Sequence, residues 1–425
     1  MLETYFAKPQ TVECIRASWI GSEVERYLGW LAGQGYGART VWRRVPRVVA
    51  FGEFARQRGA TVVGDLPAHV DAYVTERVSE HRGERKNGST AQQVAKEVRG
   101  PIEQMLRVTV PGFEGTGRAH RHTPFGEMVP RFFDEYLVAE RGLRPESVRH
   151  YAHHLHRFEA YLSKLGVRDL QELSPTLLSA FVAERSATGL AKTSVRDGCG
   201  VLRVFLRYVH REGLIGRDLS KTVEWPQVYR LSSIPRSISW TEVGRVLASV
   251  DRRTPCGKRD YAILLLLVTY GLRGREVAAL TLEAIDWKRE RLAVPQRKAG
   301  HSTAFPLSKA VGEAIVDYLQ HGRPKTTDRH VFFRSPAPVR PIGSAAVSAC
   351  AARYLLRAGV QVHRPGSHTL RHSLVQRLVD ADFALKEIGD FVGHRSPRST
   401  QIYSKVAVES LRQVALGDGE EVLDE

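Results

Sequence analysis

With 425 residues the chain is long enough for two or three domains. Its formal net charge of +17 at pH 7 favours a polyanionic partner, nucleic acid first, although a merely basic globular protein is the simpler alternative. Four scattered cysteines argue against a disulfide framework or zinc finger, and the absence of a signal-peptide pattern and of any long apolar run predicts a soluble cytoplasmic protein that does not bind membranes.

The N-terminal half contains an internal repeat. Residues Tyr27 to Arg77 read as helix, turn, helix, with Gly35 before one helix and Gly59 after it. About 107 residues later the same order of glycines and apolar positions returns, with Gly142 and Gly166 as the breakers and one residue gained. Chance similarity between two amphipathic helical segments is the alternative, but the matched breakers favour a duplication.

Two connectors separate the predicted domains. The stretch from Gly112 to Pro124 is rich in glycine and basic residues, and the stretch from Ser220 to Ser237 contains two prolines and several basic residues. The sequence Ser239-Trp240-Thr241-Glu242 then reads as the N-cap of a helix that opens a new domain.

Asp260 to Tyr270 is nearly all apolar and predicts the buried helix of this domain. It leads into Gly271-Leu272-Arg273-Gly274-Arg275-Glu276, in which Gly274 is an unusual helix residue that costs about 1 kcal/mol relative to Ala. Residues 291 to 294 and 303 to 307 read as two strands of a short hairpin, with Lys298 near its tip.

The stretch from Ser367 to Tyr403 carries the clearest chemistry. On a helix, His368 and Arg371 share one face and can reach one small anion together. Arg supplies a permanent planar charge, and the hydroxyl of Tyr403 can form a covalent intermediate, so the set suits a phosphate diester. Each residue alone has a plainer interpretation: Tyr403 as a packing residue, Arg371 as an ion-pair residue, and His368 with His372 as metal ligands, although the glutamate of a His-Glu-x-x-His site is missing.

Together these segments resemble the catalytic domain of the tyrosine recombinase (phage integrase) family. That family carries Gly-Leu-Arg-x-x-Glu, a lysine on a β-turn, His-x-x-Arg, Gly-His, and a tyrosine nine residues after that histidine. The resemblance implies a set of catalytic residues, with Arg275 and Arg297 as neighbours that could be confused with two of them: Arg273, Lys298, His368, Arg371, His394 and Tyr403.

The second copy of the repeat resembles the family's core-binding, SAM-like domain, and the first copy is an extra domain that binds DNA or a partner. The predicted fold is therefore mainly α and multidomain: two helical SAM-like domains, at 1–115 and 124–220, an α+β catalytic domain with a small antiparallel sheet at 238–416, and an acidic tail at 417–425. Several polar side chains of the second copy are candidate phosphate contacts: Ser147, Arg149, His150, His153, Arg157, Lys192, Thr193 and Arg196.

The resemblance implies a site-specific integrase or transposase that cuts and rejoins double-stranded DNA through a 3′-phosphotyrosyl intermediate, without metal, ATP or another cofactor. It also implies a homotetramer on paired DNA sites, a monomer or weak dimer when free, and a role for accessory or sister recombinases. Three alternatives stay open: a type IB topoisomerase, a DNA-binding regulator without catalysis, and a zinc hydrolase that uses His368, His372 and His394.

Overall fold

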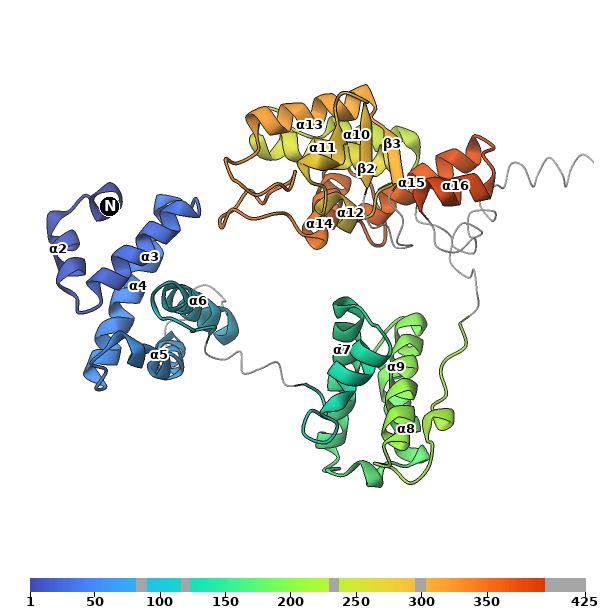
Figure 1. Ribbon diagram of the computed structural model, residues 1–425, viewed down its shortest axis with the longest axis horizontal. Helices are drawn as coiled ribbons and strands as arrows, with labels where there is room; N and C mark the ends of the chain where they lie inside the picture. The colour runs from blue at the N-terminus through green and yellow to red at the C-terminus, as the bar shows by residue number, and fades with distance from the viewer. Residues whose placement is uncertain (82–89, 116–122, 229–236, 295–302, 394–425) are drawn as a thin grey trace, which may run out of the picture. The chain divides into compact units, whose positions relative to one another are not determined.

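The computed structural model describes residues 1–81, 90–115, 123–228, 237–294 and 303–393 (Figure 1). The chain divides into two compact units. The middle unit comprises Glu114–Ser232, and the other contains Met1–Phe113 together with the chain from Ser233 onward. Within the latter, the N-terminal helices and the C-terminal helices and strands have separate hydrophobic cores, so each is described by itself.

The regular elements described in the N-terminal segment are all helices. Pro46 lies inside α4, and α6 begins at a capping box in which the Thr90 N–H donates to Gln93 Oε1 at 2.9 Å. Tyr27, Leu28, Phe51 and Leu66 are fully buried in its core. The elements are α1 Leu2–Tyr5, α2 Pro9–Ala17, α3 Gly21–Gly33, α4 Ala38–Gln57, η1 Val63–Asp65, α5 Leu66–His81 and α6 Ala91–Thr109.

The middle unit is a helical bundle around an aromatic core. Proline occupies the first turn of α7 and of α8, where its missing N–H has no intrahelical partner to lose. Phe132, Phe158 and Phe205 fill the centre. The elements are η2 Phe132–Glu140, α7 Pro145–Lys164, η3 Leu170–Glu172, α8 Pro175–Ala187, α9 Lys192–Arg211 and η4 Ser220–Thr222.

The C-terminal segment is built around α11, which is buried along almost its whole length. A three-stranded antiparallel sheet in the order β1-β2-β3 pairs Leu292 with Phe305 and turns both side chains into the core. The elements are α10 Trp240–Ala248, α11 Pro255–Tyr270, α12 Gly274–Ala278, η5 Leu282–Ala284, β1 Ile285–Asp286, β2 Arg291–Val294, β3 Thr303–Pro306, α13 Lys309–His321, α14 Ser344–Arg357, α15 Ser367–Asp380 and α16 Leu385–Val392.

The prediction of a mainly helical chain with a small antiparallel sheet is confirmed. The two predicted strands are β2 and β3, and the predicted buried helix is α11, which begins five residues earlier than expected, at Pro255. None of the helices in the described ranges is both long and apolar enough to cross a membrane.

Candidate active site

Arg273 is held rigidly at the start of a short helix. It is the N-cap residue of α12, and the Glu276 carboxylate accepts hydrogen bonds from both its backbone N–H and its Nη1, each at 2.8 Å. The Glu276 side chain is only 3% exposed. Because the buried Glu276 carboxylate binds Nη1 of Arg273, the orientation of the whole guanidinium group is fixed.

Gly274 has a packing role that its helix propensity does not show. A Cβ at this position would lie 3.2 Å from the carbonyl oxygen of Ser344 and 3.3 Å from Oγ of Ser367. The glycine therefore lets α12 lie against the first residues of α14 and α15. This close approach brings the segment that carries Arg273 next to the helix that carries His368, whereas the neighbouring Arg275 is exposed.

Arg371 on α15 is buried, with 4% of its surface exposed. Its guanidinium donates to the carbonyl oxygens of Gly271 and Val392, the latter at 2.7 Å. Nη2 of Arg273 donates to the carbonyl oxygen of Gly393 at 2.8 Å. Both arginines therefore bind the C-terminal end of α16, where helix carbonyls attract positive charge.

Gly271 makes this convergence possible. It ends α11 in the left-handed conformation, with φ 58°, and a Cβ there would lie 3.0 Å from Leu374 and 3.2 Å from Val392. A larger residue would push apart the same segments that the two arginines join.

His368 lies one helical turn before Arg371. Its pKa is lowered, first by partial desolvation and then by the positive charges of Arg371 and Arg273. The lowered pKa favours the neutral imidazole, which has one ring nitrogen able to accept a proton. The shared influence of both arginines on this ring places three of the six predicted site residues in one electropositive region.

The other three predicted residues, Lys298, His394 and Tyr403, lie outside the described residues. The two carbonyl groups at the C-terminal end of α16 that the arginines bind, those of Val392 and Gly393, directly precede His394 in the chain. The rings of His368 and His372 are 6.3 Å apart, and the described part of the chain contains no group of three His, Cys, Asp or Glu side chains suited to a metal ion. His394, the third member of the alternative zinc set, is not among those residues.

The structure adds a buried ion network that the sequence analysis did not identify. The fully buried Asp260 accepts hydrogen bonds from Arg259, Arg353 and the hydroxyl of Tyr354. Arg259 also donates to the carbonyl oxygen of Phe333 at 3.0 Å. The network ties α11 to α14, and its only sequence signal is a pair of charged residues at the start of an apolar run.

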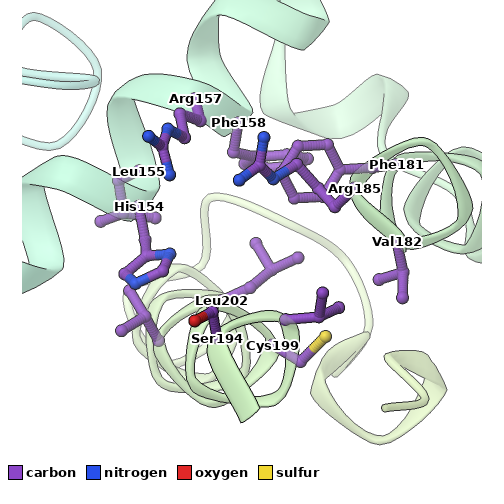
Figure 2. Close-up of a pocket in the computed structure, with 13 residues that line it drawn as sticks. His154, Leu155, Arg157, Phe158, Phe181, Val182, Arg185, Ser194, Cys199 and Leu202 are labelled. Atoms are coloured by element: carbon purple, nitrogen blue, oxygen red, sulfur yellow. The ribbon is translucent and has the colours of Figure 1, made fainter. Parts of the chain in front are cut away.

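The middle unit has a pocket between α7, α8 and α9, lined mostly by apolar residues together with three basic side chains (Figure 2). Of the candidate phosphate contacts predicted here, Arg157 lines the pocket, and His154 and Arg185, which the prediction missed, line it with Arg157. Desolvation, and then the charges of neighbouring His150, His153, Arg157 and Arg185, lower the pKa of His154 to about 4. Desolvation penalises any charge, so it is the fixed positive charges of Arg157 and Arg185 that favour an anion here.

Comparison with known proteins identifies the class. A model of the phage integrase family matches residues 237–410, and a model of the phage integrase N-terminal SAM-like domain matches residues 131–213. The protein y4rA of Sinorhizobium fredii, named an integrase/recombinase, is 31% identical over 389 residues, which is 91% of each chain. XerC of Lacticaseibacillus casei, named a tyrosine recombinase, is 27% identical over 66% of this chain and 94% of its own.

Solved structures show the same fold. The post-cleavage complex of the XerH site-specific recombinase matches 83% of this chain and 95% of its own, with TM-score 0.54 and 15% identity. A lambda integrase dimer bound to a core site matches 65% and 93%, with TM-score 0.51 and 20% identity.

The chain therefore belongs to the phage integrase family. It is a site-specific tyrosine recombinase, as the sequence motifs predicted. The predicted SAM-like domain is present in the middle unit, and the assignment of the N-terminal segment as a second copy stays a prediction.

Proposed function

We propose that the chain breaks and rejoins DNA strands with Tyr403 as the nucleophile. The observation that supports this most strongly is that Arg273 and Arg371, from two different elements, bind the backbone just before His394, and that both of their charges act on His368. Fixed guanidinium groups aimed at one place are suited to the charge on a phosphate's non-bridging oxygens.

In the proposed reaction the Tyr403 hydroxyl oxygen forms a bond to the scissile phosphorus, and the bond to the 5′-oxygen breaks. Lys298 gives its proton to that leaving oxygen, which produces a 3′-phosphotyrosyl link and a free 5′-hydroxyl. Arg273, Arg371 and His394 stabilise the charge of the pentacoordinate transition state, and the tyrosine proton passes to neutral His368.

The 5′-hydroxyl of a second strand then attacks the phosphotyrosyl bond and releases Tyr403. Each step exchanges one phosphodiester for another, so the reaction conserves the bond energy and needs no ATP. The cationic side chains take the part that metal ions play in other phosphoryl-transfer sites, and we therefore propose a reaction independent of metal and cofactor.

We propose specific duplex DNA sites as the substrate. The fold relatives include a lambda integrase dimer bound to a core site and a lambda integrase tetramer bound to a Holliday junction, the latter with TM-score 0.51. By analogy this chain, an integrase or transposase of the cytoplasm, acts as a homotetramer on paired sites and as a monomer or weak dimer when free. Accessory or sister recombinases are part of the same proposal.

In this proposal the middle unit binds the phosphate backbone of the duplex. Arg157, Arg185 and His154 line one pocket, and the exposed residues Lys192 and Arg196 lie near the start of α9. Phosphate contacts of this kind position a protein on DNA without reading its sequence.

The test begins by selecting a tightly bound duplex from random-sequence DNA. Two duplexes that carry this site are then incubated with the chain in EDTA and without ATP. We expect recombinant strands and a protein–DNA complex that survives denaturant. Relaxation of supercoiled DNA without any exchange between duplexes would instead identify a topoisomerase, and binding without covalent complex would identify a regulator.

A further inference from the structure

Helix α4 of the N-terminal segment and helix α7 of the middle unit occupy equivalent places in the chain. Each contains 20 residues. Each is preceded by a glycine with positive φ, Gly35 at 75° and Gly142 at 60°, and followed by another, Gly59 at 92° and Gly166 at 75°. The step in residue number from Gly35 to Gly142 equals the step from Gly59 to Gly166, so the two helices lie between equivalent breakers.

The turn after each helix is stabilised in the same way. Asp65 accepts hydrogen bonds from the N–H groups four and three residues before it, at 3.0 and 3.1 Å. Glu172 lies the same step beyond Asp65 and accepts from the N–H groups at the same two positions, at 3.2 and 3.0 Å. These carboxylates close the 3-10 turns η1 and η3 at equivalent positions.

The two cores match as well. In the N-terminal segment Tyr73 of α5 packs its ring 5.4 Å from Phe51 and 4.9 Å from Phe54. In the middle unit Phe181 of α8 packs 5.0 Å from Phe158 and 5.1 Å from Tyr161. Phe158 and Tyr161 follow Phe51 and Phe54 by the same number of residues as separates the equivalent glycines. Phe181 follows Tyr73 by one residue more, so one residue was gained after the turn.

The last helices, α6 and α9, match with a constant step of their own. Ile102, Met105 and Leu106 are fully buried, and their equivalents Leu202, Phe205 and Leu206 are at most 2% exposed. The same step pairs two exposed basic positions and the two exposed acids beside them: Lys96 with Arg196, and Glu97 with Asp197.

This register locates the N-terminal equivalent of the face that we proposed for DNA binding in the middle unit. Arg43 and Arg47 of α4 stand where His150 and His154 stand on α7. The bond from the Trp42 indole N–H to the carbonyl oxygen of Tyr5, at 2.5 Å, fixes the neighbouring position. The first copy therefore carries two permanently charged arginines where the second copy carries two histidines.

Three cations form one patch, which we call the α4–α6 basic face: Arg43, Arg47 and Lys96. Arg43 and Arg47 are one helical turn apart, and both reach Glu97 of α6, with Nη2–Oε2 distances of 3.5 and 3.6 Å. Lys96 is exposed and lines the same pocket as Arg43, Arg47 and Glu97. Because one carboxylate is shared by two arginines and a lysine lies beside it, the patch keeps an excess of positive charge, which attracts phosphates.

We propose that the α4–α6 basic face binds a second stretch of duplex DNA through its phosphate backbone, outside the stretch held by the middle unit. The inference rests on the proposed function, since it assigns the first copy the kind of ligand proposed for the second. The N-terminal segment is then a second DNA clamp, which extends the protein's footprint along its site.

The test measures affinity of the full chain for a long mixed-sequence duplex by fluorescence anisotropy over a range of salt concentrations. The triple variant R43Q/R47Q/K96Q should lower the slope of log K against log salt by up to about 2.7, since each lost phosphate contact contributes about 0.9. The opposite change, Glu97→Gln, should tighten binding, because it removes the acid that the two arginines share.

A matched control removes the same charge from other surfaces of this segment: R16Q/R58Q/R77Q, whose arginines pair with Glu3, Glu76 and Glu80. The control should keep the wild-type slope. Hydroxyl-radical footprinting on the selected site should show protection outside the core stretch that the triple variant at the α4–α6 basic face loses. Circular dichroism confirms that both triple variants are folded.

A variant of the middle unit, R157Q/R196Q, separates the two proposals. If it weakens binding while R43Q/R47Q/K96Q leaves slope and footprint unchanged, the N-terminal face binds something other than DNA and this inference fails. If neither variant changes the affinity, the DNA grip proposed for the middle unit fails as well.

Discussion

The Glu276→Gln variant tests whether the buried carboxylate orients Arg273 for the reaction. The substitution keeps the shape and the hydrogen-bonding reach but removes the charge that holds Nη1 at 2.8 Å. A charge-assisted hydrogen bond contributes about 1–2 kcal/mol more than a neutral one. If that difference appears as lost orientation of Arg273 in the transition state, the cleavage rate falls about 5- to 30-fold.

The assay is the single-turnover rate of covalent complex formation on a nicked suicide duplex, with DNA affinity and thermal unfolding measured in parallel. Glu242→Gln is the matched control, because Glu242 occupies the same capping position in α10, where it accepts from the Ser239 N–H at 2.9 Å. It also accepts hydrogen bonds from the Ser239 hydroxyl at 3.0 Å and from Arg245 of the same helix. We expect Glu242→Gln to cleave at a rate near that of wild type and Glu276→Gln to cleave slowly. An unchanged rate in Glu276→Gln would refute the orientation argument.

The leaving-group chemistry and the middle unit give two more predictions. Lys298→Ala should cleave poorly but recover on a duplex whose leaving 5′-oxygen is replaced by sulfur, because sulfur needs no proton; equal impairment on both duplexes would exclude a general-acid role. The pKa of His154 is about 4 in the folded chain, against an ordinary 6.5. As the pH falls, the unfolded chain therefore binds a proton at this residue before the folded chain does. Stability is lost as pH falls from about 6.5 to 4, by at most about 3 kcal/mol before solvent screening. Urea unfolding of His154→Gln should show a weaker pH dependence over this window than wild type, and an identical dependence would contradict the assignment.

Much of the fold could be predicted because local patterns coincide with the tertiary structure. The apolar run of α11 follows from burial on nearly all sides, and the alternation in β2 and β3 follows from burial of one face. The glycine breakers of the repeat follow from positive φ at the ends of helices. The first turn of α11 could not be predicted, because Thr254 and Pro255 form a capped start that contributes few apolar residues.

The site was predictable at the level of residue types and not of contacts. The motif around Arg273 indicates a phosphate ligand, but its hydrogen bond to Gly393, 120 residues away in the chain, depends on how α16 packs. Gly274 looked unfavourable because helix propensity ignores neighbours, and its reason lies in Ser344 and Ser367. His154 and Arg185 were missed because only the packing of α8 against α7 and α9 brings them together.

The central claim is tested most directly by Tyr403→Phe on the nicked suicide duplex. The variant should bind the duplex with wild-type affinity and form no denaturant-resistant complex, and the wild-type adduct, digested and analysed by mass spectrometry, should carry the nucleotide on Tyr403. A covalent complex formed by Tyr403→Phe, or an adduct on another residue, would contradict the account.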